Sequence, residues 1–358
     1  MSADLPSPAE VAALFASAQG ARGILLAVSG GPDSMAMLRL AAQWRDSTGC
    51  PPMCVATVDH GLRTEARAEA AQVGQWSAAQ GFVHHTLPWE GAKPKTRLQE
   101  AARNARYALL AAHARARGAD HILLAHHLDD QAETVLFRLA RGSGIDGLAG
   151  MESVSRHADV TLLRPLLAWP KARLVALCAA LGQPYVEDPS NADPRFARTR
   201  LRQLGAVLAA QGLDAPALAR LAMRAARARD ALAAQQRDMM TQIAPKPFES
   251  GLVANIGPLL HAPEEIALRC AGALVGQVCG PQVQPRLERL ERLCAGILPA
   301  LARNQPFRAT LAGTILVLDA NQRLTITRET PRLRGRKLPA PGVAAAGQAG
   351  GGDVSSLS

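Results

Sequence analysis

The segment Ser29–Ser34 has residue types that could hold the phosphates of a nucleotide. It reads Ser-Gly-Gly-Pro-Asp-Ser, follows the apolar run 23–28 and precedes a helical pattern. Two glycines let the backbone approach an anion closely, and a helix start adds its positive end. Asp33 would repel a bare phosphate, but it could bind a Mg²⁺ that bridges to phosphate oxygens. The segment lacks the lysine of the common GxxxxGK[ST] loop, and the alternative interpretation is a glycine turn with a helix cap.

Two more polar clusters follow expected strands. Asp59 comes after the run 53–58, where an acid can accept a ribose hydroxyl or a base amine; a turn cap is the alternative. The segment 126–134 (HHLDDQAET) could ligate a metal, or its acids could simply stabilise a helix start. Asp130 and Glu133 are three residues apart, so they share one helical face. Such a carboxylate pair can hold an ammonium group and later accept its proton.

Short apolar runs alternate with helical patterns in the first half of the chain. Strands are expected at 23–28, 53–58, 82–87 and 121–125, and helices at 33–45, 65–80, 97–117, 129–140 and 171–181. This alternation predicts an α/β fold with a parallel sheet and helices on both faces. Ligands bind such sheets at the carboxyl ends of the strands, where the polar clusters lie. After residue 195 the chain is Arg- and Ala-rich and mainly helical, and 310–327 predicts a β-hairpin.

The composition fits a two-domain protein with a polyanionic partner. The chain has 358 residues, 48% of them apolar, which is enough for two buried cores. Its net charge of +10 favours nucleic acid as a partner. However, only five of the 40 basic residues are lysine, so the bias could also reflect a GC-rich genome.

The cysteines and the N-terminus indicate a reducing, cytoplasmic location. Six cysteines are scattered without a CxxC pair, which argues against zinc and iron–sulfur sites and favours reduced thiols. The N-terminus has no basic and apolar regions typical of a signal peptide. No run approaches 18 apolar residues, so we expect no membrane span.

Five blocks, in this order, resemble the tRNA(Ile)-lysidine synthetases of the PP-loop superfamily. They are SGGPDS at 29–34, VDHGLR at 58–63, HHLDDQAET at 126–134, RGSGIDGLAGM at 141–151, and EDPSN with the basic stretch at 187–202. Thr199 and Leu201 depart mildly from the Asn and Ile of the family pattern. The resemblance covers about residues 23–205, and the second domain matches only in length, helical character and closing hairpin.

The resemblance implies a PP-loop, Rossmann-like fold of the adenine nucleotide α-hydrolase type. It also implies a reaction. The wobble cytidine (position 34) of a CAU-anticodon isoleucine tRNA attacks the α-phosphate of ATP and pyrophosphate leaves. Free L-lysine then displaces AMP at C2, which gives lysidine and switches decoding from AUG to AUA.

The predicted site residues are placed by their match to a block, except Arg106, which matches an arginine of the family that touches ATP phosphate. The catalytic residues are Asp33, Asp130 and Glu133, and Asp33 is also the expected Mg²⁺ ligand. The residues expected to bind ATP are Ser29, Gly30, Gly31, Pro32, Asp33, Ser34, Asp59 and Arg106. The residues expected to bind tRNA are His126, Arg141, Arg195, Arg198, Arg200 and Arg202. Taken alone, the segment 141–151 could be a flexible loop and 195–202 a solvated basic helix.

We expect a catalytic domain at 1–210, a mainly helical tRNA-binding domain at 211–332 with a terminal hairpin, and a disordered tail at 333–358. The tail is rich in Pro, Gly, Ala and Ser and has too few apolar residues to offset the entropy cost of ordering. Two alternatives remain: a PP-loop tRNA thiolase, against which the missing CxxC and the EDPSN block argue, and a non-catalytic ATP- or RNA-binding module. A homodimer is left open.

Overall fold

The computed structural model describes residues 5–46, 49–94, 96–187, 204–280, 283 and 285–329. The chain divides into two compact units, Met1–Gln235 and Gln236–Ser358, and the division falls within helix α10 (Ala215–Ile243). The predicted boundary at residue 210 stays a prediction, and the predicted tail at 333–358 lies outside the described residues.

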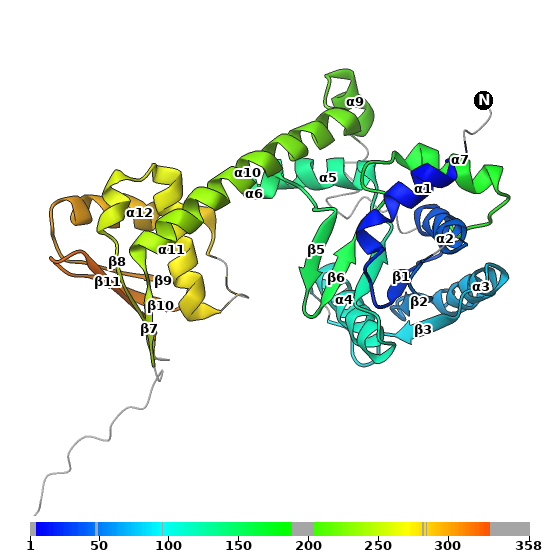
Figure 1. The fold of residues 1–358 in the computed structure, drawn as a ribbon, viewed down its shortest axis with the longest axis horizontal. Helices are drawn as coiled ribbons and strands as arrows, with labels where there is room; N and C mark the ends of the chain where they lie inside the picture. The colour runs from blue at the N-terminus through cyan, green and yellow to red at the C-terminus, as the bar shows by residue number, and fades with distance from the viewer. Residues whose placement is uncertain are drawn as a thin grey trace, which may run out of the picture. The chain divides into compact units, whose positions relative to one another are not determined.

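The first unit is built on a six-stranded sheet in the order β3-β2-β1-β4-β6-β5 (Figure 1). Five strands are parallel: β1 (Ile24–Ala27), β2 (Met53–Asp59), β3 (His84–Pro88), β4 (His121–Leu124) and β6 (Val160–Leu163). The predicted α/β fold is thereby confirmed. Two strands of this sheet were not predicted: the antiparallel edge strand β5 (Val154–His157), whose residues are mostly exposed, and β6, which is only four residues long.

Helices cover both faces of this sheet, as predicted (Figure 1). One face packs on α1 (Pro8–Leu14), α2 (Pro32–Arg45), α3 (Ala66–Ala79) and α7 (Lys171–Ala180). The other face packs on α4 (Leu98–Ala116) through Tyr107 and Leu110. In β1, the Leu25 side chain packs in the core on the α4 side and Leu26 in the core on the α2 side. Because both faces of the strand are buried, the strand is apolar throughout.

Two helices follow β4 in the first unit, α5 (Leu128–Leu139) and α6 (Ile145–Leu148), and α9 (Gly205–Ala210) precedes α10. Ala132 and Val135 of α5 pack in a small buried cluster with Leu218 and Ala222 of α10. This cluster holds α5, whose first turn carries Asp129 and Asp130.

The second unit contains a five-stranded antiparallel sheet in the order β7-β8-β11-β10-β9. Its strands are β7 (Lys246–Phe248), β8 (Gly251–Asn255), β9 (Phe307–Leu311), β10 (Thr314–Leu318) and β11 (Arg323–Arg328), and its helices are α11 (Glu264–Cys279) and α12 (Leu287–Ala302). The predicted hairpin is confirmed as β10–β11. The other three strands were missed in a region that was expected to be mainly helical. None of the described helices is both long and apolar enough to cross a bilayer.

Candidate active site

The predicted polar clusters converge on one edge of the first sheet because their strands are parallel. The loop Ser29–Ser34 follows β1, Asp59 ends β2, the pair His126–His127 follows β4 and Arg164 follows β6. Helix α4 runs back to the start of β4, so its N-terminal half lies toward the same edge. This is the edge at which open α/β sheets bind ligands.

The glycine loop has a backbone conformation that only glycine adopts readily. Gly30 has φ +92°, and its carbonyl oxygen accepts a hydrogen bond from the N–H of Val186 at 2.9 Å. Ser34 Oγ donates to the carbonyl of Gly31 at 2.9 Å and accepts from the N–H of Ser29 at 3.2 Å. Gly31 starts α2 without a capping side chain, so the first N–H groups of that helix are left for a ligand.

A buried imidazole, His127, lies among three carboxylates from two elements. Its Nε2 is 3.4 Å from Oδ2 of Asp33 and 3.4 Å from Oδ2 of Asp130, and its Nδ1 is 3.5 Å from Oδ2 of Asp129. The side chain is only 3% exposed. Since Asp33 begins α2 and the other two acids begin α5, His127 links the phosphate loop to α5.

The charges in this cluster raise the pKa of His127 and lower the pKa of Asp129. Burial opposes protonation of His127, but hydrogen bonds to Asp129 and Asp33 and the charge of Asp130 raise its pKa to about 9. The hydrogen bond from His127, aided by the N–H of Lys171, lowers the pKa of Asp129 to about 2. The surrounding carboxylates therefore favour the protonated form of His127.

Replacing His127 with alanine is expected to lower the free energy of unfolding by about 2 kcal/mol, because it leaves three carboxylates close together without their common cation. Denaturant titration measures this loss. His121→Ala is the control, since His121 pairs with Asp120 at 2.8 Å in a more exposed position at the start of β4 and should cost less than about 1 kcal/mol. Equal losses in the two variants would contradict the assignment.

The structure brings the three predicted catalytic acids into one neighbourhood. Burial raises the pKa of Asp130, and the charges of Glu133 and Asp33 raise it further against the opposing charge of His127. The Asp130 carboxylate also accepts the N–H of His127 at 3.1 Å, which caps α5. A cationic substrate group placed here would offset the repulsion between these carboxylates.

One carboxylate oxygen of Asp33 has no hydrogen-bond partner among the described residues and could bind a divalent cation. Its Oδ2 faces His127 and lies 3.7 Å from Nζ of Lys171, whereas its Oδ1 is buried with no hydrogen-bond partner among the described residues. Within that part of the chain, no group of three His, Cys, Asp or Glu side chains is arranged to hold a metal. A Mg²⁺ at Asp33 would therefore need oxygen ligands from nucleotide phosphates, which is how proteins commonly bind this ion.

The remaining predicted residues have more varied surroundings. Asp59 Oδ1 accepts the N–H of Gly61 at 2.8 Å, a bond typical of the turn-cap interpretation. The guanidinium carbon of Arg141 lies 3.9 Å from the ring centroid of Phe137. Arg195, Arg198, Arg200 and Arg202 lie outside the described residues. The roles of all these residues in binding ATP or tRNA stay predictions.

His126 is held in its neutral form. Burial lowers its pKa to about 2, and the cations Arg106, Arg164 and Arg103 act in the same direction. Its Nδ1 is buried and has no hydrogen-bond partner among the described residues. A neutral imidazole can donate or accept a hydrogen bond at a base or a phosphate, as the predicted contact with tRNA requires.

The sequence did not predict a functional role for three residues of this neighbourhood, which are His127, Asp129 and Lys171. Asp129 accepts the main-chain N–H of Lys171 at 2.8 Å, which joins the starts of α5 and α7. A lysine directly after Pro170 at the start of an expected helix gives no local signal of contact with Asp33. Only the parallel arrangement of the strands brings α7 to the loop.

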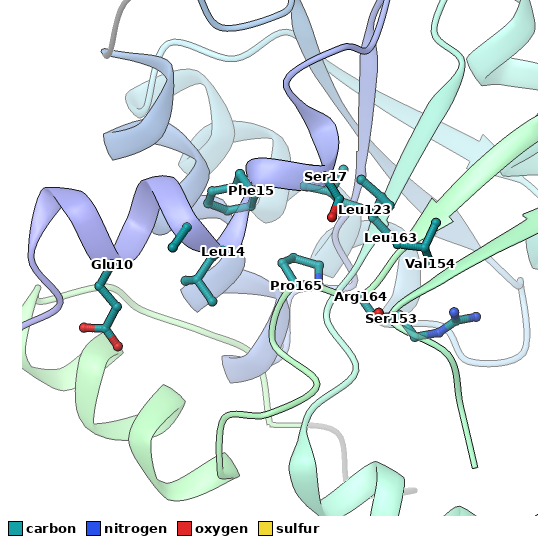
Figure 2. A pocket seen from close by; sticks show the side chains of 11 residues that line it. Glu10, Leu14, Phe15, Ser17, Leu123, Ser153, Val154, Leu163, Arg164 and Pro165 are labelled. Atoms are coloured by element: carbon teal, nitrogen blue, oxygen red, sulfur yellow. The ribbon is translucent and has the colours of Figure 1, made fainter. Parts of the chain in front are cut away.

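A cavity of about 280 Å³ lies away from these groups, between α1 and the sheet (Figure 2). Its walls include Leu14, Phe15, Leu163 and Pro165, and they are mainly apolar. The guanidinium of Arg164 extends away from Leu14 and Pro165 in Figure 2. None of the predicted catalytic, ATP-binding or tRNA-binding residues lines this cavity.

The chain is similar to known proteins over most of its length. The family model described as the PP-loop domain matches residues 5–208. The chain is 49% identical over 318 residues to a tRNA(Ile)-lysidine synthase of Methylobacterium nodulans, covering 88% of this chain and 93% of the relative. It is 46% identical over 344 residues to a tRNA(Ile)-lysidine synthase of Rhodopseudomonas palustris, covering 92% and 97%.

Among solved structures, the U34-tRNA thiolase NcsA from Methanococcus maripaludis, with its [4Fe-4S] cluster, has a similar fold. The TM-score is 0.52 at 18% identity, with 61% of this chain and 77% of that chain covered. This likeness concerns the fold alone. The six cysteines of the present chain are all free thiols, and three of them are buried.

Proposed function

The chain belongs to the tRNA(Ile)-lysidine synthase family, and on that premise we propose that it ligates free lysine to C2 of the wobble cytidine of the CAU-anticodon isoleucine tRNA at the expense of ATP. The observation that carries the proposal is the similarity to tRNA(Ile)-lysidine synthases, at up to 49% identity over nearly the full length of those relatives. The loop at 29–34 and the acids of α5 lie together at one sheet edge, as such a reaction requires.

In the first step, the loop at 29–34 and the start of α2 hold the ATP phosphates with backbone N–H groups. Asp33 would hold a Mg²⁺, which would supply positive charge against the phosphates. The C2 oxygen of the cytidine attacks the α-phosphorus, the bond to the β-phosphate oxygen breaks and pyrophosphate leaves. Lys171 Nζ, 3.7 Å from Asp33, adds positive charge beside the loop.

In the second step, Asp130 and Glu133 bind the ε-ammonium of lysine and take its proton. The free amine attacks the adenylated C2, a C–N bond forms and AMP leaves with the C2 oxygen. No covalent bond to the enzyme is needed. The burial that raises the pKa of Asp130 makes this carboxylate a better proton acceptor than an ordinary aspartate.

The test is lysine transfer with purified protein, Mg²⁺-ATP and labelled lysine. We expect label in unmodified CAU-anticodon isoleucine tRNA, with AMP and pyrophosphate released in equal amounts, and none in the CAU-anticodon methionine tRNA. A reaction without ATP is the control for labelled lysine that stays with the tRNA without a covalent bond. Absence of label with folded protein that binds ATP would overturn the proposal.

A further inference from the structure

Two arginines of α4 contact Tyr107 on the α4 side of the sheet, and a third, Arg164, lies close enough to act on it electrostatically. The guanidinium carbons of Arg103 and Arg106 lie 5.1 Å and 5.4 Å from the ring centroid of Tyr107. Arg103 Nη2 donates to the Tyr107 hydroxyl at 3.3 Å. Arg164 approaches from the end of β6 and acts electrostatically on both Tyr107 and His126.

This positive charge has no counter-charge within the described part of the chain. None of Arg103, Arg106 and Arg164 forms an ion pair with a described carboxylate. The Nε atoms of Arg106 and Arg164 are buried without hydrogen-bond partners there. Burial alone would raise the pKa of Tyr107, yet the three cations lower it. Cations collected at a sheet edge without a carboxylate are costly unless an anion binds them.

The position of the cluster favours the second substrate over the nucleotide. The glycine loop follows β1, and Asp59 ends β2, which lies on one side of β1. Arg164 follows β6, which lies on the other side of β1 and is separated from it by β4. An ATP molecule held at β1 and β2 leaves the β4–β6 side of the edge to the group that attacks it.

We propose that Arg103, Tyr107 and Arg164 form a subsite for a backbone phosphate of the RNA strand that carries the target cytidine. The identity of that RNA rests on the proposed function. Arg164 is a fixed charge, because its Nη1 donates to the carbonyl of Glu152 at 2.7 Å and to Ser155 Oγ at 2.9 Å. Arg103 lies on the exposed side of α4, where it can close on a phosphate. Arg106 is not included in the subsite, because it stays a predicted ligand of the ATP phosphates.

Arg103→Gln tests the subsite, because this exposed side chain can be changed without opening the core. Binding of the isoleucine tRNA is measured without ATP at several salt concentrations, and ATP binding is measured by calorimetry without tRNA. We expect tRNA affinity to fall about tenfold at low salt, and the slope of log K against log salt to fall by about 1. ATP affinity should stay within about twofold of the wild type.

Two further variants separate a phosphate contact from a structural role. Arg103→Lys keeps the charge, so its salt slope should stay close to that of the wild type. Arg115→Gln removes a cation from the other end of the same helix, where Arg115 pairs with Asp159 at 3.2 Å, and should leave tRNA binding unchanged. Melting temperatures show that each variant is folded.

The outcomes are distinct. Weakened tRNA binding with unchanged ATP binding supports the subsite. Weakened ATP binding with unchanged tRNA binding overturns it and assigns Arg103 to the nucleotide, and no change in either also overturns it. If the wild type binds tRNA but transfers no lysine, the proposed function fails, while the binding arms still decide the subsite.

Discussion

Gly30→Ala is expected to reduce ATP affinity by about a hundredfold and to lower the melting temperature. The residue has φ +92°, a conformation that strains any side chain. A Cβ there would lie 2.9 Å from Cγ2 of Val73 and 3.3 Å from Cγ2 of Val186. The loop would have to shift, and the loss of two hydrogen bonds to a charged phosphate, at about 1.5 kcal/mol each, corresponds to about a hundredfold in affinity. Calorimetric ATP titration and a thermal melt measure the two effects.

Gly31→Ala is the matched control for backbone strain. Gly31 has φ −71°, which any residue adopts, and its Cβ would meet nothing closer than Ser29 Oγ at 3.9 Å. Its melting temperature should therefore stay close to that of the wild type. If Gly30→Ala bound ATP as well as Gly31→Ala did, the loop would not hold the phosphates in the conformation described here.

The sequence predicted four of the six strands of the first sheet, because the signals for these four are local. The run 23–28 is apolar throughout and the next residues are glycine, so both the strand and the loop could be placed without tertiary information. The parallel arrangement then put the loop, Asp59 and His126 at one edge, as the structure does. The short strand β5 gave no such signal, since exposed polar residues make up most of it.

The site was only partly predictable because its decisive contacts join distant segments. Asp33 was expected to bind Mg²⁺, and no local pattern predicted a buried imidazole against it. The link from His127 to Asp33, and that from Lys171 to the same carboxylate, exist only once the fold brings the starts of α2, α5 and α7 together at the edge. Likewise, the charge around Tyr107 comes from residues after β6 as well as from α4.

Glu133→Gln is expected to raise the KM for lysine by about 10- to 100-fold while tRNA-dependent release of pyrophosphate from ATP changes less than about threefold. Glu133 lies one turn into α5, on the face of Asp130, and its charge raises the pKa of that buried carboxylate. A neutral amide removes half of the charge that attracts an ammonium group. Glu133 is preferred to Asp130 for this test because Asp130 also caps α5.

The two partial reactions make the result decisive. If Glu133 binds lysine, the variant should accumulate adenylated tRNA at low lysine, and high lysine should restore transfer. Glu264→Gln, an exposed acid at the start of α11, controls for the loss of one negative charge and should behave as the wild type. Equal loss of pyrophosphate release and lysine transfer would instead place Glu133 in the adenylation step. Because adenylation needs no ammonium group, only a lysine-binding role predicts that the two steps separate.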